Sequence, residues 1–329
     1  MIDANGRSIN YLRISVTDRC NLRCKYCMPR EGVKLREHSD ILTFDEIKRI
    51  VKVCGDLGIE NIRLTGGEPL VRKDIVKLIE DIKHINTIKD ISITTNGVML
   101  ADYIDDLKNA GLDRINISLD TLDKNKFKEI TGFDVFDKVI EGIKLSIEKG
   151  FRSVKLNVVT MRENNISEVM DFVNLAEKDP IDVRFIELMP IGLGNLFTRI
   201  SNDELKSIIQ KNKTLIPYNN FNGFGPAKYF KTLTSKGSIG FISPISHEFC
   251  SKCNKVRLTS EGFLKLCLHW NSGINLRDKL RDGIDDTRLK ELIYASIRDK
   301  PNKHEFDLVE DNKNEHEKYD LRSMFQIGG

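Results

Sequence analysis

Short apolar stretches alternate with amphipathic stretches of helical period along the first two thirds of the chain. The stretches expected to form strands are 12–16, 62–65, 91–94, 115–119, 154–159 and 183–188, and the stretches expected to form helices are 43–58, 75–82, 103–107, 135–147, 166–176 and 204–209. This alternation predicts an α/β fold with a parallel sheet. A partial, TIM-like (β/α)6 barrel is favoured over a flat doubly wound sheet, although both share the pattern. Active residues are expected at the carboxyl ends of the strands.

The rhythm changes near residue 219, where Gly, Pro and Ser separate short apolar pieces such as 240–242 and 263–266. We therefore predict a core domain at 1–218 and a smaller C-terminal region at 219–329. The region ends in a charged, helix-rich tail. Its run 300–319 is polar enough to be flexible.

Composition excludes several classes of protein. Charged residues make up 31% of the 329 residues, and no apolar run reaches the roughly 18 residues needed to cross a bilayer. The N-terminus lacks the apolar segment of a signal peptide. A net charge of +3 is too small to suggest a nucleic-acid surface. A cytoplasmic protein without membrane or nucleic-acid partners is expected.

Three cysteines, Cys20, Cys24 and Cys27, follow the first expected strand within one loop. This spacing is typical of metal ligands, because thiolates bind iron-sulfur clusters and zinc. Three ligands on a four-iron cluster leave one iron open, whereas structural zinc needs a fourth ligand. Unligated or disulfide-linked cysteines are the remaining alternative. Cys54 lies among apolar helix residues and is interpreted as a buried core residue.

A second group, Cys250, Cys253 and Cys267, also offers three thiolates. A zinc ribbon completed by His247 or His269 is the simplest reading of this group taken alone.

Cationic residues lie within strands whose neighbours are apolar, namely Arg13, Arg63, Lys155 and Arg184. A buried cation without a partner is costly. Ion pairs with Glu187, Asp120 or Glu68 are one solution. A bound triphosphate explains four convergent cations better, because Arg and Lys suit phosphate oxygens.

The first cysteine group, with Tyr26 before its last cysteine, resembles the cysteine loop of radical S-adenosylmethionine (SAM) enzymes. Residues 65–69, Thr-Gly-Gly-Glu-Pro, resemble the motif with which that superfamily holds the SAM amino group, and the Glu68 carboxylate is expected to accept from an amine. With the second cysteine group and the Gly328-Gly329 end, nearly the whole chain resembles the GTP 3′,8-cyclase family of molybdenum cofactor biosynthesis.

The resemblance implies a radical SAM barrel with two 4Fe-4S clusters, one held by each cysteine group. It implies a lyase in which reductive cleavage of SAM gives a 5′-deoxyadenosyl radical. That radical removes the 3′ hydrogen of GTP, and the carbon radical closes onto carbon 8 to give 3′,8-cyclo-7,8-dihydro-GTP. The second cluster would contact the guanine.

The resemblance also implies roles for individual residues. The expected SAM contacts are Tyr26, Gly67, Ser118 and Met189. The expected GTP contacts are Arg13, Arg63, Thr94, Lys155, Lys255, Val256 and Arg257. The expected catalytic residues are Arg184, Gly328 and Gly329. Lys255 stands where the family often has Arg, so one contact keeps its charge but loses a planar fork of donors.

The implied partners are GTP, a flavodoxin or ferredoxin type electron donor and the next pathway enzyme, cyclic pyranopterin monophosphate synthase. A monomer and a homodimer are both compatible with the sequence. Two other functions stay open: a related radical SAM enzyme acting on a peptide or another nucleotide, and a zinc-dependent binding module.

Overall fold

The computed structural model describes residues 1–33, 36–219, 225–306, 319–320 and 322–328. Its strands form one 12-stranded sheet in the order β12-β11-β10-β1-β2-β3-β4-β5-β6-β9-β8-β7. The parallel strands at its centre are β1 (Tyr11–Ser15), β2 (Asn61–Thr65), β3 (Asp90–Thr95), β4 (Arg114–Ser118), β5 (Ser153–Thr160) and β6 (Asp182–Glu187). The predicted strands are confirmed to within two residues.

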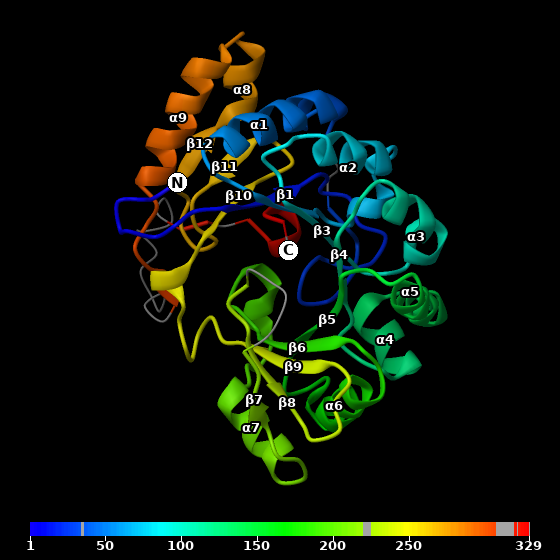
Figure 1. The fold of residues 1–329 in the computed structure, drawn as a ribbon. Coiled ribbons are helices and arrows are strands. Elements are labelled where there is room, and N and C mark those ends of the chain that lie inside the picture. Colours follow the sequence, from blue (N-terminus) through cyan, green and yellow to red (C-terminus); the bar gives the residue numbers. More distant parts are fainter. Residues whose placement is uncertain (34–35, 220–224, 307–318, 321, 329) are drawn as a thin grey trace.

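Helices connect these strands on the outer side of the curved sheet, whereas the C-terminus lies on its inner side (Figure 1). The helices are α1 (Phe44–Asp56), α2 (Ile75–Lys83), α3 (Leu100–Asn109), α4 (Lys124–Thr131), α5 (Phe136–Glu148), α6 (Val169–Lys178) and α7 (Asn202–Gln210). Because β1 to β6 follow one another in chain order, right-handed crossovers place every helix on the same face. A doubly wound sheet would have helices on both faces, so the partial barrel is correct.

The C-terminal region extends both edges of this sheet. On one side β10 (Lys255–Leu258) pairs in parallel with β1 and is followed by β11 (Phe263–Lys265) and β12 (Gly273–Asn275). On the other side β9 (Ser238–Ile242) pairs in parallel with β6 and lies next to β8 (Lys228–Lys231). The outermost strand on that side, β7 (Ile216–Pro217), precedes residue 219. The outermost strands are β12 and β7, so the barrel is open. The helices α8 (Leu276–Arg281) and α9 (Asp286–Arg298) follow β12.

Local sequence explains where α1 begins and why Cys54 is buried. The Thr43 hydroxyl accepts from Glu46 N, and the Glu46 carboxylate accepts from Thr43 N, which completes a capping box. Cys54 is fully buried in the core, as expected. The helix α4 was not expected, because only Phe127 and Ile130 give its charged sequence an apolar face; both are buried.

The start of the run 300–319 is not a solvated tail. Lys300 is buried, and its ammonium donates to the Leu266 carbonyl. The flexibility expected for this run was wrong at Lys300, because Arg7 and Leu266 hold that residue in place; residues 307–318 lie outside the described residues.

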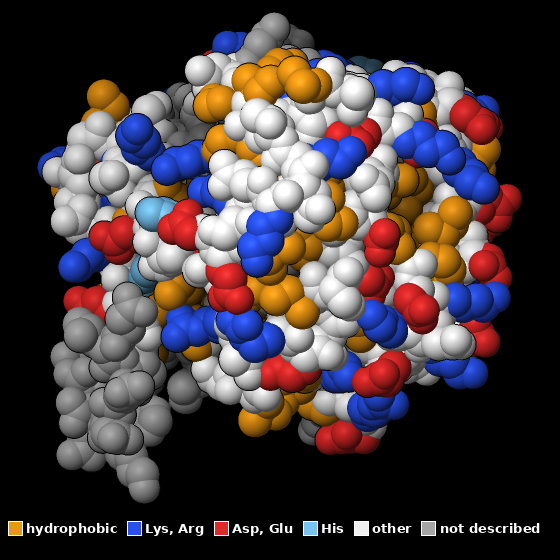
Figure 2. All heavy atoms as spheres, turned by 90° about the horizontal axis from the view of Figure 1, so that it is seen from below, with side chains coloured by type: hydrophobic (Ala, Val, Ile, Leu, Met, Phe, Trp, Pro, Cys, Tyr) orange, Lys and Arg blue, Asp and Glu red, His pale blue; other side chains and the backbone are white. Residues whose placement is uncertain are grey.

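The surface at the bottom of Figure 1, which carries α7, has Lys, Arg, Asp and Glu side chains interspersed (Figure 2). Several of these are exposed ion pairs, such as Lys206–Asp203 and Arg162–Glu204. No helix among the described residues has the length and apolar character that a membrane span requires.

The inner face of the barrel is polar, because each strand turns alternate residues toward opposite faces. Leu12 and Ile14 pack into the core, whereas Arg13 aligns with Arg63 of β2 and Arg257 of β10. Further around the barrel, Asp90 of β3 binds Arg114 of β4 and also Arg152, which precedes β5. Lys155 of β5 binds Asp182 of β6 at 2.9 Å.

Replacing Asp90 with alanine should destabilise the protein by about 3–5 kcal/mol, the usual cost of removing one partner from a buried ion pair. The reason is that two arginines share this carboxylate, whose side chain is only 2% exposed. Chemical denaturation would measure the change. Asp137→Ala is the matched control, because the Asp137 side chain is 76% exposed in its pair with Lys124; equal losses would contradict the prediction.

Candidate active site

One cavity of about 370 Å³ lies on the inner side of the barrel and is lined by all six cysteines of the two groups. The first group lies in the loop after β1, at the carboxyl end of that strand. The second group lies before β10 and after β11. The two groups, 223 residues apart at Cys27 and Cys250 (250 − 27), therefore face the same space.

The glycine pair after β2 supports the first cysteine loop through the backbone. Gly67 N donates to Thr17 O at 2.7 Å, and Glu68 N donates to Arg19 O at 2.7 Å. A β-carbon on Gly66 would lie 2.6 Å from Thr17 O. Only glycine allows this approach, so the pair fixes the chain that carries the cysteines.

The Glu68 carboxylate is engaged by the protein itself. It accepts from Leu70 N at 3.0 Å, Thr95 Oγ1 at 2.7 Å and Asn96 N at 2.6 Å. Burial raises its pKa to about 7. The carboxylate joins the ends of β2 and β3, and Glu68 also lines the cavity, so its acceptance of a hydrogen bond from an amine of a bound molecule stays a prediction.

Tyr26 is fixed by a residue that the sequence analysis did not place in the site. Its hydroxyl donates to Asp120 Oδ2 at 2.6 Å, and Asp120 Oδ1 accepts from Val159 N at 2.8 Å. Burial raises the pKa of Asp120 to about 6. The carboxylate thus connects the cysteine loop to β4 and β5. Its position directly after a strand was the available signal.

The second cysteine group is held by Arg7, which is 5% exposed. Its guanidinium donates to Cys250 O at 3.1 Å and to the carbonyls of Lys300, Pro301 and Asn302 at 2.8–3.0 Å. Asp3 accepts from Arg7 Nε at 2.6 Å. Arg7 therefore joins the loop of Cys250 to the turn after α9. No spacing pattern marks this arginine, so sequence reasoning missed it.

Burial disfavours the thiolate form of the three cysteines in the first group. Burial raises the pKa of Cys20 to about 11 and that of Cys27 to about 12, and burial also raises the pKa of Cys24. In the second group burial works in the same direction on Cys253, but Lys300 and Lys255 outweigh it and lower the pKa. A positively charged metal centre would favour the thiolate form in both groups.

Sulfur spacing distinguishes a cluster from zinc. A single tetrahedral zinc with bonds of about 2.3 Å holds its thiolates within roughly 4 Å of one another. Among the described residues neither cysteine group has its three sulfurs within 4.8 Å. A cluster binds each cysteine through a different iron and suits the wider spacing. The residues therefore fit iron-sulfur clusters.

The histidines proposed to complete a zinc ribbon take different places. His247 is exposed, and its Nε2 contacts Asp203 at 2.6 Å, so this histidine does not complete a site with the second group. His269 lines the cavity, and its buried Nε2 has no hydrogen-bond partner among the described residues. Glu248, Cys250 and His304 do bring ligand atoms within 4.8 Å of one another, but this set uses one cysteine only.

Cations without carboxylate partners gather along the cavity. The basic residues from the strands that line it are Arg13, Arg63, Arg184, Lys255 and Arg257. Burial lowers the pKa of Arg13, Arg63 and Arg257, and it lowers that of Lys255 to about 7. None of the five has an ion pair among the described residues. The cavity is therefore built for an anion.

The expected ion pairs with Glu187, Asp120 and Glu68 are absent among the described residues. Glu187 accepts from Asn202 N at 2.9 Å and from Ser246 N at 3.0 Å. Asp120 accepts from the Tyr26 hydroxyl, and Glu68 accepts from the Thr95 hydroxyl. The pairing hypothesis was wrong because these strand-end carboxylates bind backbone amides and hydroxyl groups of neighbouring segments.

Most of the expected site residues meet in the cavity. Its lining includes Tyr26, Gly67, Thr94, Ser118 and Met189. Lys155 and Val256 do not line it: Lys155 pairs with Asp182, and Val256 belongs to the apolar core. The Gly328 carbonyl accepts from Arg13 Nε, and Gly329 lies outside the described residues.

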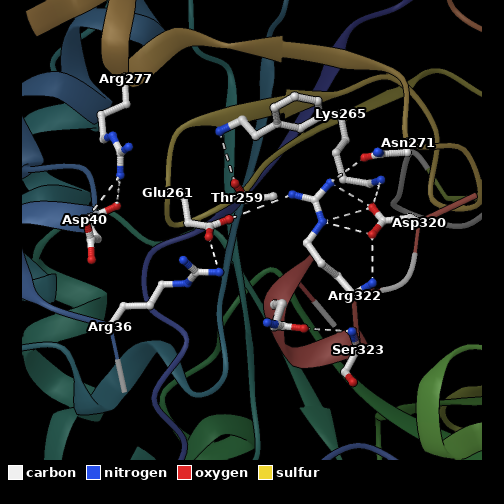
Figure 3. A network of polar contacts seen from close by, with 12 residues as sticks. Arg36, Asp40, Thr259, Glu261, Lys265, Asn271, Arg277, Asp320, Arg322 and Ser323 are labelled. Carbon is white, nitrogen blue, oxygen red and sulfur yellow. Dashed lines mark hydrogen bonds and ion pairs between the residues drawn. The ribbon is translucent and has the colours of Figure 1, made fainter. Parts of the chain in front are cut away.

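A polar network anchors the segment that leads to Gly328 (Figure 3). Asp320 binds the fully buried Lys265 and accepts from Arg322 Nε at 2.9 Å. Arg322 also reaches Glu261 at 3.8 Å, and Glu261 binds Arg36. Past this anchor, Met324 and Phe325 line the cavity. The network thus joins β11 and the chain after the first cysteine group to the C-terminal segment.

Replacing Asp320 with alanine should loosen this segment, because it leaves the Lys265 ammonium buried without its countercharge. Backbone amides of residues 322–328 should exchange hydrogen at least about tenfold faster, as measured by mass spectrometry. Asp286→Ala is the control, because the Asp286–Arg49 pair is exposed. Equal exchange in the two variants would show that Asp320 is not the anchor.

Comparisons with known proteins agree with this geometry. Residues 14–176 match the radical SAM superfamily, and residues 181–306 match the family Molybdenum Cofactor Synthesis C. The structure of Streptococcus suis SuiB bound to S-adenosylmethionine has a similar fold, with a TM-score of 0.62, 18% identity, and coverage of 89% of this chain and 68% of that chain. The fold and the first cysteine loop define a radical SAM enzyme with an iron-sulfur cluster.

Relatives that match the chain over its full length identify its family within the radical SAM enzymes. The chain is 49% identical to the GTP 3′,8-cyclase of Clostridium perfringens (strain SM101 / Type A), 47% to that of Alkaliphilus oremlandii and 45% to that of Syntrophomonas wolfei, each time over 100% of both chains. The chain belongs to the GTP 3′,8-cyclase family.

Proposed function

We propose that this protein is a radical SAM lyase that converts GTP to 3′,8-cyclo-7,8-dihydro-GTP, the first step of molybdenum cofactor biosynthesis. The observation that carries the proposal is the 45–49% identity to GTP 3′,8-cyclases over the full length. The shared cavity supports it, because it is lined by two cysteine groups and by cations that have no ion pair among the described residues.

Each cysteine group would hold one 4Fe-4S cluster. Cys20, Cys24 and Cys27 would leave one iron open for SAM, and the second group would leave one open toward the guanine. When bound, the first cluster supplies the electron that cleaves SAM. We assign SAM contacts to Tyr26, Gly67, Ser118 and Met189, which share this part of the cavity.

The cations would bind and orient the triphosphate. Arg13, Arg63, Lys255 and Arg257 come from adjacent strands and approach the anion from one wall. Arg184 and Thr94 lie across the same cavity, and the Arg184 guanidinium donates to Asn116 at 2.6 Å. These groups would hold the flexible nucleotide so that its ribose lies beside the bound SAM. Such positioning supplies much of the rate enhancement.

Two of the expected GTP contacts, Lys155 and Val256, do not line the cavity. Lys155 already has Asp182 as a countercharge, and the Val256 side chain packs in the core. A role of either in binding GTP would require a movement or a backbone contact. Gly328 is better placed, because its carbonyl accepts from Arg13; the same role for Gly329 remains a prediction.

The test is an oxygen-free assay with SAM, GTP and dithionite. We expect 5′-deoxyadenosine and a cyclised GTP product to form together, and 5′-deoxyadenosine without a GTP product would reject the proposal. Metal analysis should find about eight irons per chain and no zinc. The similarity to SuiB shows the fold alone, so an activity on peptides is not favoured.

The partners named by the sequence analysis remain predictions. They are a flavodoxin or ferredoxin type electron donor and cyclic pyranopterin monophosphate synthase as the next enzyme. The cytoplasmic location, the choice between monomer and homodimer, and the boundary at 218/219 are predictions of the same kind.

A further inference from the structure

Tyr11 lies in the wall of the cavity and has no role so far. It is the first residue of β1 and is aligned with Lys255 on β10 and with Asn61 on β2. Strand alternation puts its side chain on the same face as Arg13. The residue is 3% exposed and lines the cavity. At the sequence level it resembles an ordinary core aromatic residue.

The ring of Tyr11 lies among the cations. The Arg63 guanidinium carbon is 5.5 Å from the ring centroid, and the Lys255 ammonium is 5.8 Å from it. At these distances the ring face attracts both cations. The ring therefore helps to hold the cationic wall in place, independently of its hydroxyl.

The hydroxyl of Tyr11 is buried and has no hydrogen-bond partner among the described residues. Buried polar groups are nearly always paired, and leaving one unpaired is costly. A phenol at this place can donate one hydrogen bond. Its neighbours Arg63 and Lys255 are donors too, so they leave the phenolic hydrogen without an acceptor. An anion bound by these cations would supply the acceptor.

The position of Tyr11 along β1 indicates which end of the substrate it meets. The first cysteine group follows the carboxyl end of β1, whereas Tyr11 begins the strand at Tyr11–Ser15. Four residues of strand span about 13 Å. Tyr11 therefore lies in the part of the cavity farthest along β1 from that group. If SAM and the ribose lie beside the first group, the phosphates extend toward Tyr11.

We propose that the Tyr11 hydroxyl donates a hydrogen bond to the terminal phosphate of bound GTP. This inference rests on the proposed function and adds a substrate contact to it. Tyr11 would recognise the length of the phosphate chain, whereas the cations recognise its charge. A charge-assisted hydrogen bond of this kind contributes more than a neutral one.

The test compares Tyr11→Phe with the wild type by anaerobic calorimetry on the cluster-loaded protein. The variant keeps the ring and removes only the hydroxyl. The dissociation constant for GTP should rise at least tenfold, while those for GDP and SAM stay within twofold. Iron content and melting temperature report whether the variant is intact. Tyr294→Phe is the matched control, because Tyr294 is exposed on α9.

The other outcomes overturn the inference. Unchanged GTP binding would mean that a water molecule satisfies the hydroxyl. Equal weakening for GTP and GDP would place the contact elsewhere on the nucleotide, and weaker SAM binding as well would indicate a structural role only. Failure of the wild type to bind or cyclise GTP would reject the proposed function itself. Normal wild-type turnover with normal GTP binding by Tyr11→Phe would reject this inference alone.

Discussion

Replacing Cys267 with serine is expected to abolish cyclisation of GTP while SAM cleavage persists. Cys267 follows β11 and lines the cavity with Cys250 and Cys253, away from the loop of the first group. A hydroxyl is a poor ligand for iron, so the second cluster should be lost and the iron content should fall from about eight to about four per chain. The cyclised product should drop by more than about a hundredfold, beyond the effect of losing an outer-sphere partner.

The measurement is the ratio of 5′-deoxyadenosine to cyclised product, together with iron content. Cys54→Ser is the control, because Cys54 is buried in the core and belongs to neither group. The Cys54→Ser variant should keep the full iron content and form the cyclised product, even if the substitution lowers the stability of the protein. Normal amounts of product from Cys267→Ser would show that the second group does not hold a cluster needed for the reaction.

The second large effect is expected from Cys24→Ser, which should abolish SAM cleavage itself. Cys24 is the middle ligand of the first group, and its backbone carbonyl accepts from Cys27 N at 2.8 Å. Without its thiolate the group keeps two ligands. About four irons per chain should remain, all in the second group. The two serine variants thus lose similar amounts of iron but different reactions.

Chromatography of 5′-deoxyadenosine under dithionite would check this result. Binding of GTP should survive in Cys24→Ser, because the cations of β1, β2 and β10 are untouched. A Cys24→Ser variant that still cleaves SAM would show that the first group is not the SAM centre.

Patterns over a few residues predicted the features of the fold and the site that depend on residues close together in the sequence. The strand–helix alternation, the capping box at Thr43 and the cysteine spacings are local, so the fold class and both cysteine groups could be predicted. Contacts that depend on the register between strands could not be predicted from the sequence. Lys155 looked like a substrate ligand until β5 and β6 aligned it with Asp182. Arg7 binds carbonyls nearly 300 residues away, which no spacing pattern reports.

Two further residues have surroundings that the sequence does not reveal. Glu68 lies in a motif expected to meet a ligand amine; it lines the cavity, and its carboxylate also binds Thr95 and two backbone amides. Tyr11 has the character of a core residue, and only the register beside Lys255 brings it into the cavity. In both cases the tertiary environment, rather than the side chain, decides the role.

The pairing of β10 with β1 has a consequence for biosynthesis. Asn254, just before β10, donates to the Asn10 side chain at 2.8 Å across 244 residues. A polypeptide leaves the ribosome N-terminus first, so Cys20, Cys24 and Cys27 emerge long before β10. Until β10 has been synthesised, the cavity that these cysteines line lacks one of its walls, because Lys255 and Arg257 of β10 line it as well.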